Sequence, residues 1–232
     1  MKKALLLLLA VPLAFATPAR ADQVNLFSFT GFDYVVHNNA GPPSGTWIDQ
    51  FDNYVVVGFV TQFGPNLAGS MDMVNNEYTL RISKAVASSV YYDGFSLEVL
   101  FSNNARIRAF EDSKTLGTPA VYGTAPPNAT TPSTFIDGTK IIGADLDVMI
   151  LTYDYTAAQG NLLSDFATID VGTMLPLVPV AQRAGWLLSG LASIPNASVP
   201  SGYVNQVSGE LLIPGPTPTT HKSWGAIKAL YR

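Results

Sequence analysis

The chain has 232 residues, no cysteine, 13 basic and 17 acidic residues, and a formal net charge of −4. Only 13% of its residues are charged and 47% are hydrophobic, which is enough apolar material for a buried core. An acidic chain with few, scattered basic residues is a poor partner for nucleic acid. The lack of cysteine excludes disulfides, thiolate metal sites and a cysteine nucleophile.

Residues 1–21 have the pattern of a secretory signal peptide. Two lysines precede an apolar run that ends at Ala16, and Ala19-Arg20-Ala21 has the small residues that a signal peptidase reads. We expect cleavage before Asp22 and a secreted, cell-surface or periplasmic bacterial protein. This leader holds three of the 13 basic residues and no acidic one, so the mature chain has a net charge of −7 and no predicted transmembrane segment.

Alternating runs rich in Val, Ile, Tyr and Phe predict the first strands at residues 24–30, 32–37 and 54–63. The third run is almost continuously apolar, which indicates that both of its faces are covered. Residues 69–83 are expected to form a hairpin around Asn75-Asn76, since asparagine tolerates the positive φ angles of a tight hairpin turn.

Later in the chain, residues 95–101 alternate cleanly and could pair with 105–110 as a second hairpin. Residues 115–133 are rich in proline and predict a long ordered loop. Residues 175–202 leave two interpretations open, a short helix over 180–192 or a strand over 185–192. Further strands are expected in the ranges 141–155, 164–174 and 203–213.

Many short strands with frequent turns are typical of a sandwich, a jelly roll or a barrel. We expect an all-β domain over residues 22–213, an antiparallel β-sandwich or jelly-roll-like fold of about ten strands. Sixteen prolines argue against an outer-membrane barrel. Residues 214–221 predict a Pro-rich spacer, and residues 222–232 a basic amphipathic tail with a short helix.

Few residues are suited to catalysis. The only histidines, His37 and His221, are remote from each other and lack metal-ligand spacing, so a zinc site or a Ser-His-Asp hydrolase is disfavoured. Asp145 and Asp147 lie two apart on one predicted strand and therefore share a face, as the paired acids of a glycoside hydrolase would.

Tyr153 and Tyr155 follow those two acids on the same predicted strand. Aromatic rings beside carboxylates resemble the composition of a sugar-binding groove, so we take Asp145, Asp147, Tyr153 and Tyr155 as candidate ligand-binding residues. The opposing interpretation is a solvent-exposed strand end.

Calcium is the one metal that this composition suits, because Asp and Asn oxygens are its usual ligands. Asp49, Asp52 and Asn53 form the candidate site, although their spacing matches no known calcium loop. No other cofactor is expected.

The last residues form a distinct basic segment. Trp224, Ile227 and Tyr231 recur at i, i+3 and i+7 on one helical face, and Lys228 and Arg232 suit a helix C-terminus. Such a tail could pack back on the domain, or it could be recognised by a secretion machine, the envelope or a partner.

Together these patterns predict an exported, non-catalytic β-protein that acts by binding or as a surface or matrix component. Its expected partners are a glycan or an envelope or matrix protein, and its oligomeric state is left open. The alternative is a carbohydrate-active enzyme that uses Asp145 and Asp147.

Overall fold

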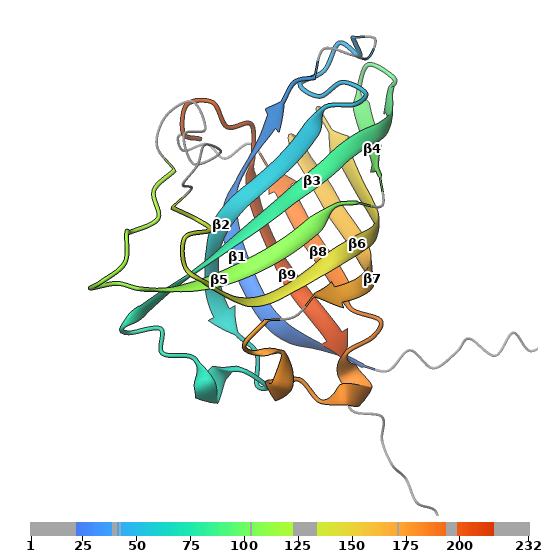
Figure 1. Ribbon diagram of the computed structural model, residues 1–232. Helices are drawn as coiled ribbons and strands as arrows, with labels where there is room; N and C mark the ends of the chain where they lie inside the picture. Colours follow the sequence, from blue (N-terminus) through green and yellow to red (C-terminus); the bar gives the residue numbers. More distant parts are fainter. Residues whose placement is uncertain are drawn as a thin grey trace, which may run out of the picture.

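The computed structural model describes residues 22–38, 41, 43–102, 104–122, 134–170, 172–193 and 199–215, without the side chains of 166–170. Nine strands dominate this part of the chain (Figure 1). They are β1 (Gln23–Val36), β2 (Asn53–Phe63), β3 (Asn76–Tyr92), β4 (Ser96–Phe101), β5 (Arg106–Ser113), β6 (Thr139–Asp154), β7 (Gln159–Asp170), β8 (Leu187–Ser193) and β9 (Gln206–Pro214).

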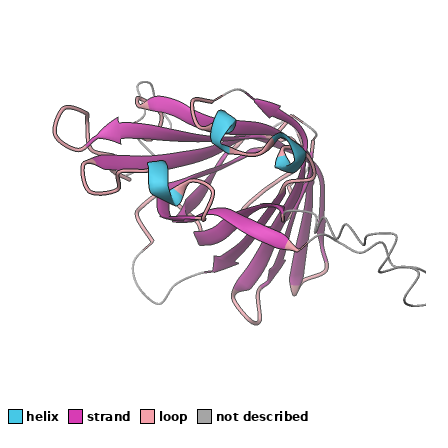
Figure 2. Ribbon diagram, turned by 90° about the horizontal axis from the view of Figure 1, so that it is seen from below, coloured by secondary structure: helices cyan, strands magenta, loops and turns pink. Residues whose placement is uncertain are grey.

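Helical structure in the described ranges consists of short 3-10 turns, η1 (Ala68–Ser70), η3 (Leu175–Leu177) and η4 (Val180–Gln182). These turns lie at the lower end of the molecule in Figure 1, the end that Figure 2 shows face-on. Within the described ranges, no helix is long and apolar enough to span a lipid bilayer.

The nine strands close into one antiparallel barrel. The sheet order is β2-β1-β9-β8-β7-β6-β4-β3-β5, and the additional pairs β2–β3 and β6–β5 complete the ring. Strands β4 and β5 both pair with β3 and β6, over different parts of their length, so they share one of eight positions in the wall. Each described strand therefore has a neighbour on both sides over at least part of its length, which closes the wall.

The expected sandwich or jelly roll is thus wrong in architecture, although the all-β antiparallel class is confirmed. Sandwiches and barrels share the same alternation of apolar and polar residues along each strand. What separates them here is the pairing of β1 with β9, which joins residues at opposite ends of the domain. Local sequence patterns do not predict a pairing between strands so far apart in the chain.

The barrel interior is filled by side chains. The gap beside Phe27, Ile107 and Trp186 is too small to admit a water molecule. An eight-stranded barrel is just wide enough for its own side chains to fill. Every strand contributes to this one apolar cluster, as shown by Phe27, Val56, Leu80, Val99, Ile107, Leu151, Leu162, Leu188 and Leu211.

A second apolar layer covers the outside of β1, β2 and β3. Phe135 and Tyr203, from the segments after β5 and before β9, pack with Tyr34, Val55 and Val57 on the outer face of the wall. Strand β2 is therefore buried on both sides, which confirms the interpretation of its continuous apolar run.

Both predicted hairpins are wrong. Strand β3 begins at Asn76 and pairs with β2 and β5, while Asp72 accepts hydrogen bonds from the N–H groups of Val74 and Asn75 in a turn before it. Strands β4 and β5 do not pair with each other but follow one another along the wall. Of the two interpretations of residues 180–192, the strand is correct, since only Val180–Gln182 is helical.

A buried carboxylate ties β1 to the segment that leads into β9. Asp33 is fully buried and accepts hydrogen bonds from the Tyr54 hydroxyl at 2.8 Å and from the backbone and side-chain N–H groups of Asn205 at 2.6 and 2.9 Å. Burial raises the pKa of Asp33 to about 6, because the three hydrogen bonds offset only part of the lost hydration.

This raised pKa predicts how stability varies with pH. The native state holds the Asp33 proton more tightly than the unfolded state, so the contribution of Asp33 is fully present below the unfolded pKa of 3.8 and is lost as pH rises through about 6. We expect Asp33→Asn to flatten the fall in the free energy of unfolding between pH 4.5 and 7.5, by roughly 2–3 kcal/mol. Urea unfolding at the two pH values measures this, and an unchanged slope would contradict it.

Candidate functional site

The upper end of the barrel in Figure 1 presents two tight turns that lie against each other. In the β3–β4 turn, the Asp93 carboxylate accepts hydrogen bonds from the N–H groups of Phe95 and Ser96, and these hold the pKa of Asp93 below its ordinary value. In the β6–β7 turn, the Asp154 carboxylate accepts from Thr156 and Ala157. Each turn is therefore held by its own aspartate.

A backbone hydrogen bond from Tyr155 to the carbonyl of Phe95 joins the two turns at 2.9 Å. The rings of Tyr92 and Tyr155 meet edge to face with centroids 5.5 Å apart. Tyr91 and Phe95 are 64% and 71% exposed, a large exposure for aromatic side chains on a folded domain. We call Tyr91, Tyr92, Phe95 and Tyr155 the aromatic rim.

A shallow groove of about 210 Å³ runs down the outer wall from the aromatic rim. Tyr91 stands at its side, and its floor belongs to β4, β6 and β7. Most of the side chains that line it can donate or accept hydrogen bonds, namely Ser96, Glu98, Thr152, Asp154, Gln159 and Asn161.

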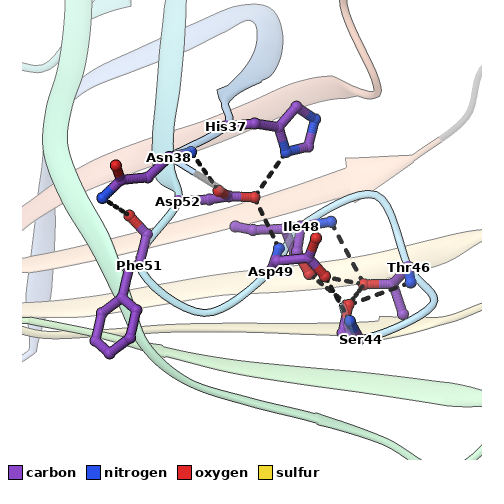
Figure 3. Close-up of polar contacts among 8 residues, drawn as sticks. All are labelled: His37, Asn38, Ser44, Thr46, Ile48, Asp49, Phe51 and Asp52. Carbon is purple, nitrogen blue, oxygen red and sulfur yellow. Dashed lines mark hydrogen bonds and ion pairs between the residues drawn. The ribbon is translucent and has the colours of Figure 1, made fainter. Parts of the chain in front are cut away.

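The loop between β1 and β2 folds over the same end and carries the second candidate site (Figure 3). The Asp52 side chain, 1% exposed, accepts hydrogen bonds from His37 Nδ1 at 2.8 Å and from the N–H groups of Asn38 and Asp49. The Asp49 carboxylate in turn accepts from the N–H of Ser44. Burial alone would raise the pKa of Asp52, but these donors together hold it below its ordinary value.

This loop site brings together two of the three predicted calcium ligands, Asp49 and Asp52, and adds His37, with ligand atoms within 4.8 Å of one another. Hydrogen bonds to the loop backbone already occupy both carboxylates, which accounts for their position without an ion. Asn53 lies in the β2 ladder opposite Val36.

The His37–Asp52 pair resembles two members of a catalytic triad, but in the described ranges no hydroxyl group hydrogen-bonds to His37. A base without a nucleophile within reach does not make an acyl-transfer site. The arrangement is best explained as an anchor that ties the end of β1 to the loop.

The four predicted ligand-binding residues lie in three different places. Asp145 and Asp147 are solvent-accessible on the wall, Tyr153 points into the barrel and is 2% exposed, and Tyr155 belongs to the aromatic rim. Asp145 forms ion pairs with Arg106 and Arg108 at 3.0 and 3.1 Å. The structure therefore does not gather these residues into one groove.

Sequence reasoning missed the most exposed aromatic residues of the rim, Tyr91 and Phe95. The sequence Tyr91-Tyr92-Asp93-Gly94-Phe95 did carry a signal, since Asp-Gly is a strong turn dipeptide and here it is flanked by aromatic residues. The predicted recognition residues Trp224, Ile227, Lys228, Tyr231 and Arg232 lie outside the described residues.

No protein-family model matches the chain, and no curated protein matches it. The structure and the sequence therefore carry the functional argument alone.

The loop anchor predicts a defined loss of stability. Asp52→Ala leaves the N–H groups of Asn38 and Asp49 without their acceptor, so we expect the free energy of unfolding at pH 7 to fall by about 2 kcal/mol. Asp49→Ala, which removes one acceptor in the same loop, is the matched control and should cost less. Urea unfolding compares the two, and an equal or larger loss for Asp49→Ala would refute the anchor role.

The calcium prediction has a separate test. A native-state calcium site would raise the midpoint of thermal unfolding in calcium relative to a chelator, and Asp49→Ala would abolish that rise. Equal midpoints with and without calcium would reject the site.

Proposed function

We propose that the protein is an exported, non-catalytic binding protein whose aromatic rim and adjoining groove recognise neutral glycan chains. The observation that carries this proposal is the clustering of exposed aromatic rings beside a groove lined by hydrogen-bonding side chains. Export rests on the leader pattern of residues 1–21.

Sugars present two kinds of surface, apolar C–H faces and hydroxyl groups. The aromatic rim suits the first kind, and the adjoining groove suits the second. The C–H faces of a pyranose ring pack on aromatic rings, for which Tyr91 and Phe95 are exposed. The hydroxyl groups of a sugar need donors and acceptors at a short distance, and Glu98, Gln159 and Asn161 supply these in the groove.

The size and openness of the groove favour part of a polymer over a small free ligand. Pockets that enclose drug-sized ligands typically measure about 300–1,000 Å³. The groove is smaller, about 210 Å³, and lies on the outer wall. It would therefore contact one or two units of a chain that otherwise stays in solvent.

The negative charge of the chain and of the groove favours neutral glycans over acidic ones. The chain is acidic overall, and Glu98 and Asp154 line the groove itself. A polyanionic glycan would be repelled from such a surface, so neutral glycans are the better match.

The alternative, an enzyme that uses Asp145 and Asp147, has less support. Arg106 and Arg108 both bind Asp145, which suits a structural ion pair on the wall. A hydrolase also needs its two acids to face each other across the scissile bond, whereas these two come from the same strand.

The proposal predicts that Tyr91→Ala weakens glycan binding about tenfold, because the loss of one stacking ring costs about 1–1.5 kcal/mol. The purified protein would be screened on immobilised neutral and acidic glycans, and dissociation constants for the best neutral glycan would then be measured by calorimetry.

Two variants serve as controls for this experiment. Tyr91→Phe keeps the ring and should bind nearly as well as the parent protein. Leu116→Ala removes a still more exposed side chain, 92% accessible against 64% for Tyr91, away from the rim and should not change the affinity. Failure to retain any glycan, or equal binding by Tyr91→Ala, would reject the proposal.

A further inference from the structure

One side of the barrel carries an uncovered apolar surface. Leu100, Ile150 and Leu163 are cross-strand neighbours on β4, β6 and β7, and they form a row on the outer face. Leu100 and Leu163 are 40% and 48% exposed. Val148 and Leu191 extend the surface and are each 45% exposed. We call this outer surface of β4, β6, β7 and β8 the bare wall.

The contrast with β1, β2 and β3 is informative. There the chain covers its own wall with Phe135 and Tyr203, whereas on the bare wall no described segment lies over the apolar row. Contiguous apolar surface of this kind marks a contact site in soluble proteins.

The bare wall is hollowed and flanked by acids. A groove of about 350 Å³ opens between Val148, Leu163 and Leu187 and has the exposed side chain of Asp165 in its lining. The exposed Asp147 precedes Val148 on β6, and the exposed Glu210 of β9 is paired with Ser189 of β8. An occupant that is apolar on one face and basic around it would match both features.

The C-terminal segment has that composition. Trp224, Ile227 and Tyr231 are spaced to share one helical face, and Lys228 and Arg232 add positive charge to an otherwise acidic protein. This segment would present an aromatic side chain to the groove and two cations to the acids around it.

The exit point of the chain places this segment within reach. Strand β9 ends at Pro214, and its residue Leu212 pairs with Leu187, which lines the groove. Residues 215–223 can span up to about 30 Å when extended. The groove lies two strands from β9, about 10 Å across the sheet.

We propose that the C-terminal segment, residues 222–232, docks on the bare wall of its own chain, with Trp224 in the groove between Val148, Leu163 and Leu187. This inference is independent of the proposed glycan binding, since the groove of the aromatic rim and the groove of the bare wall have different linings.

A second copy of the barrel is the weaker occupant. A symmetric contact between two bare walls would bring Asp147 and Asp165 of both copies together, and like charges across an interface are unfavourable. The basic C-terminal segment would instead place positive charges beside these acids, so this repulsion would not arise.

The absence of native cysteine allows a direct test by disulfide cross-linking. In the full chain, Leu163→Cys combined with Ile227→Cys, a position on the docked helical face, should form an intramolecular disulfide under mild oxidation by diamide. Leu116→Cys with Ile227→Cys is the control, because Leu116 is also exposed but lies off the bare wall. We expect the Leu163 pair to cross-link about tenfold faster than the control pair, since docking raises the effective concentration of the two thiols.

Each outcome bears on the proposal. A rate for the Leu163 pair that falls on adding 0.5 M salt, or with Asp165→Lys, would support docking through the acidic flank. Equal rates for the two pairs would overturn the proposal, because they describe a tethered but undocked segment. Disulfide-linked dimers would also overturn it, in favour of exchange of the segment between copies. Circular dichroism of each variant checks that the barrel is intact.

Discussion

The pairing of β1 with β9 is the constraint on which the rest of the structure depends. It joins residues 23–32 to residues 206–214, the two ends of the domain, and it closes the sheet without any disulfide. Bringing such distant segments together costs chain entropy that grows slowly with separation. In return every strand gains two hydrogen-bonded neighbours, and the interior becomes a packed core enclosed by the wall.

Closure also decides where recognition can take place. Side chains from every described strand pack together in the interior, so the described residues that are open to a ligand lie on the outer surface and the rim. The outer surface is divided: one part is covered by Phe135 and Tyr203, and the bare wall is open. The aromatic rim lies above this wall, where the turns after β3 and β6 meet.

The all-β class and the burial of β2 on both faces could be predicted from the sequence, because both depend on local patterns of apolar residues. Barrel closure could not, since it depends on a pairing between remote strands. The turn expected at Asn75-Asn76 shows the same limit: the dipeptide suits a hairpin, yet β3 pairs with β2 over residues 79–86 and with β5 over residues 76–83. At the candidate site, the Asp93-Gly94 turn could be predicted from its dipeptide. Its contact with Tyr155 could not, because that contact depends on the register between β4 and β6.

The pairing of β1 with β9 also determines where the two ends of the described chain leave the barrel. The N–H of Gly215 hydrogen-bonds to the carbonyl of Asp22, so the two ends of the described chain leave the barrel side by side. They leave at the lower end in Figure 1, opposite the rim. A fusion partner or support joined directly at Asp22 or Gly215 would therefore lie at the end of the barrel opposite the aromatic rim.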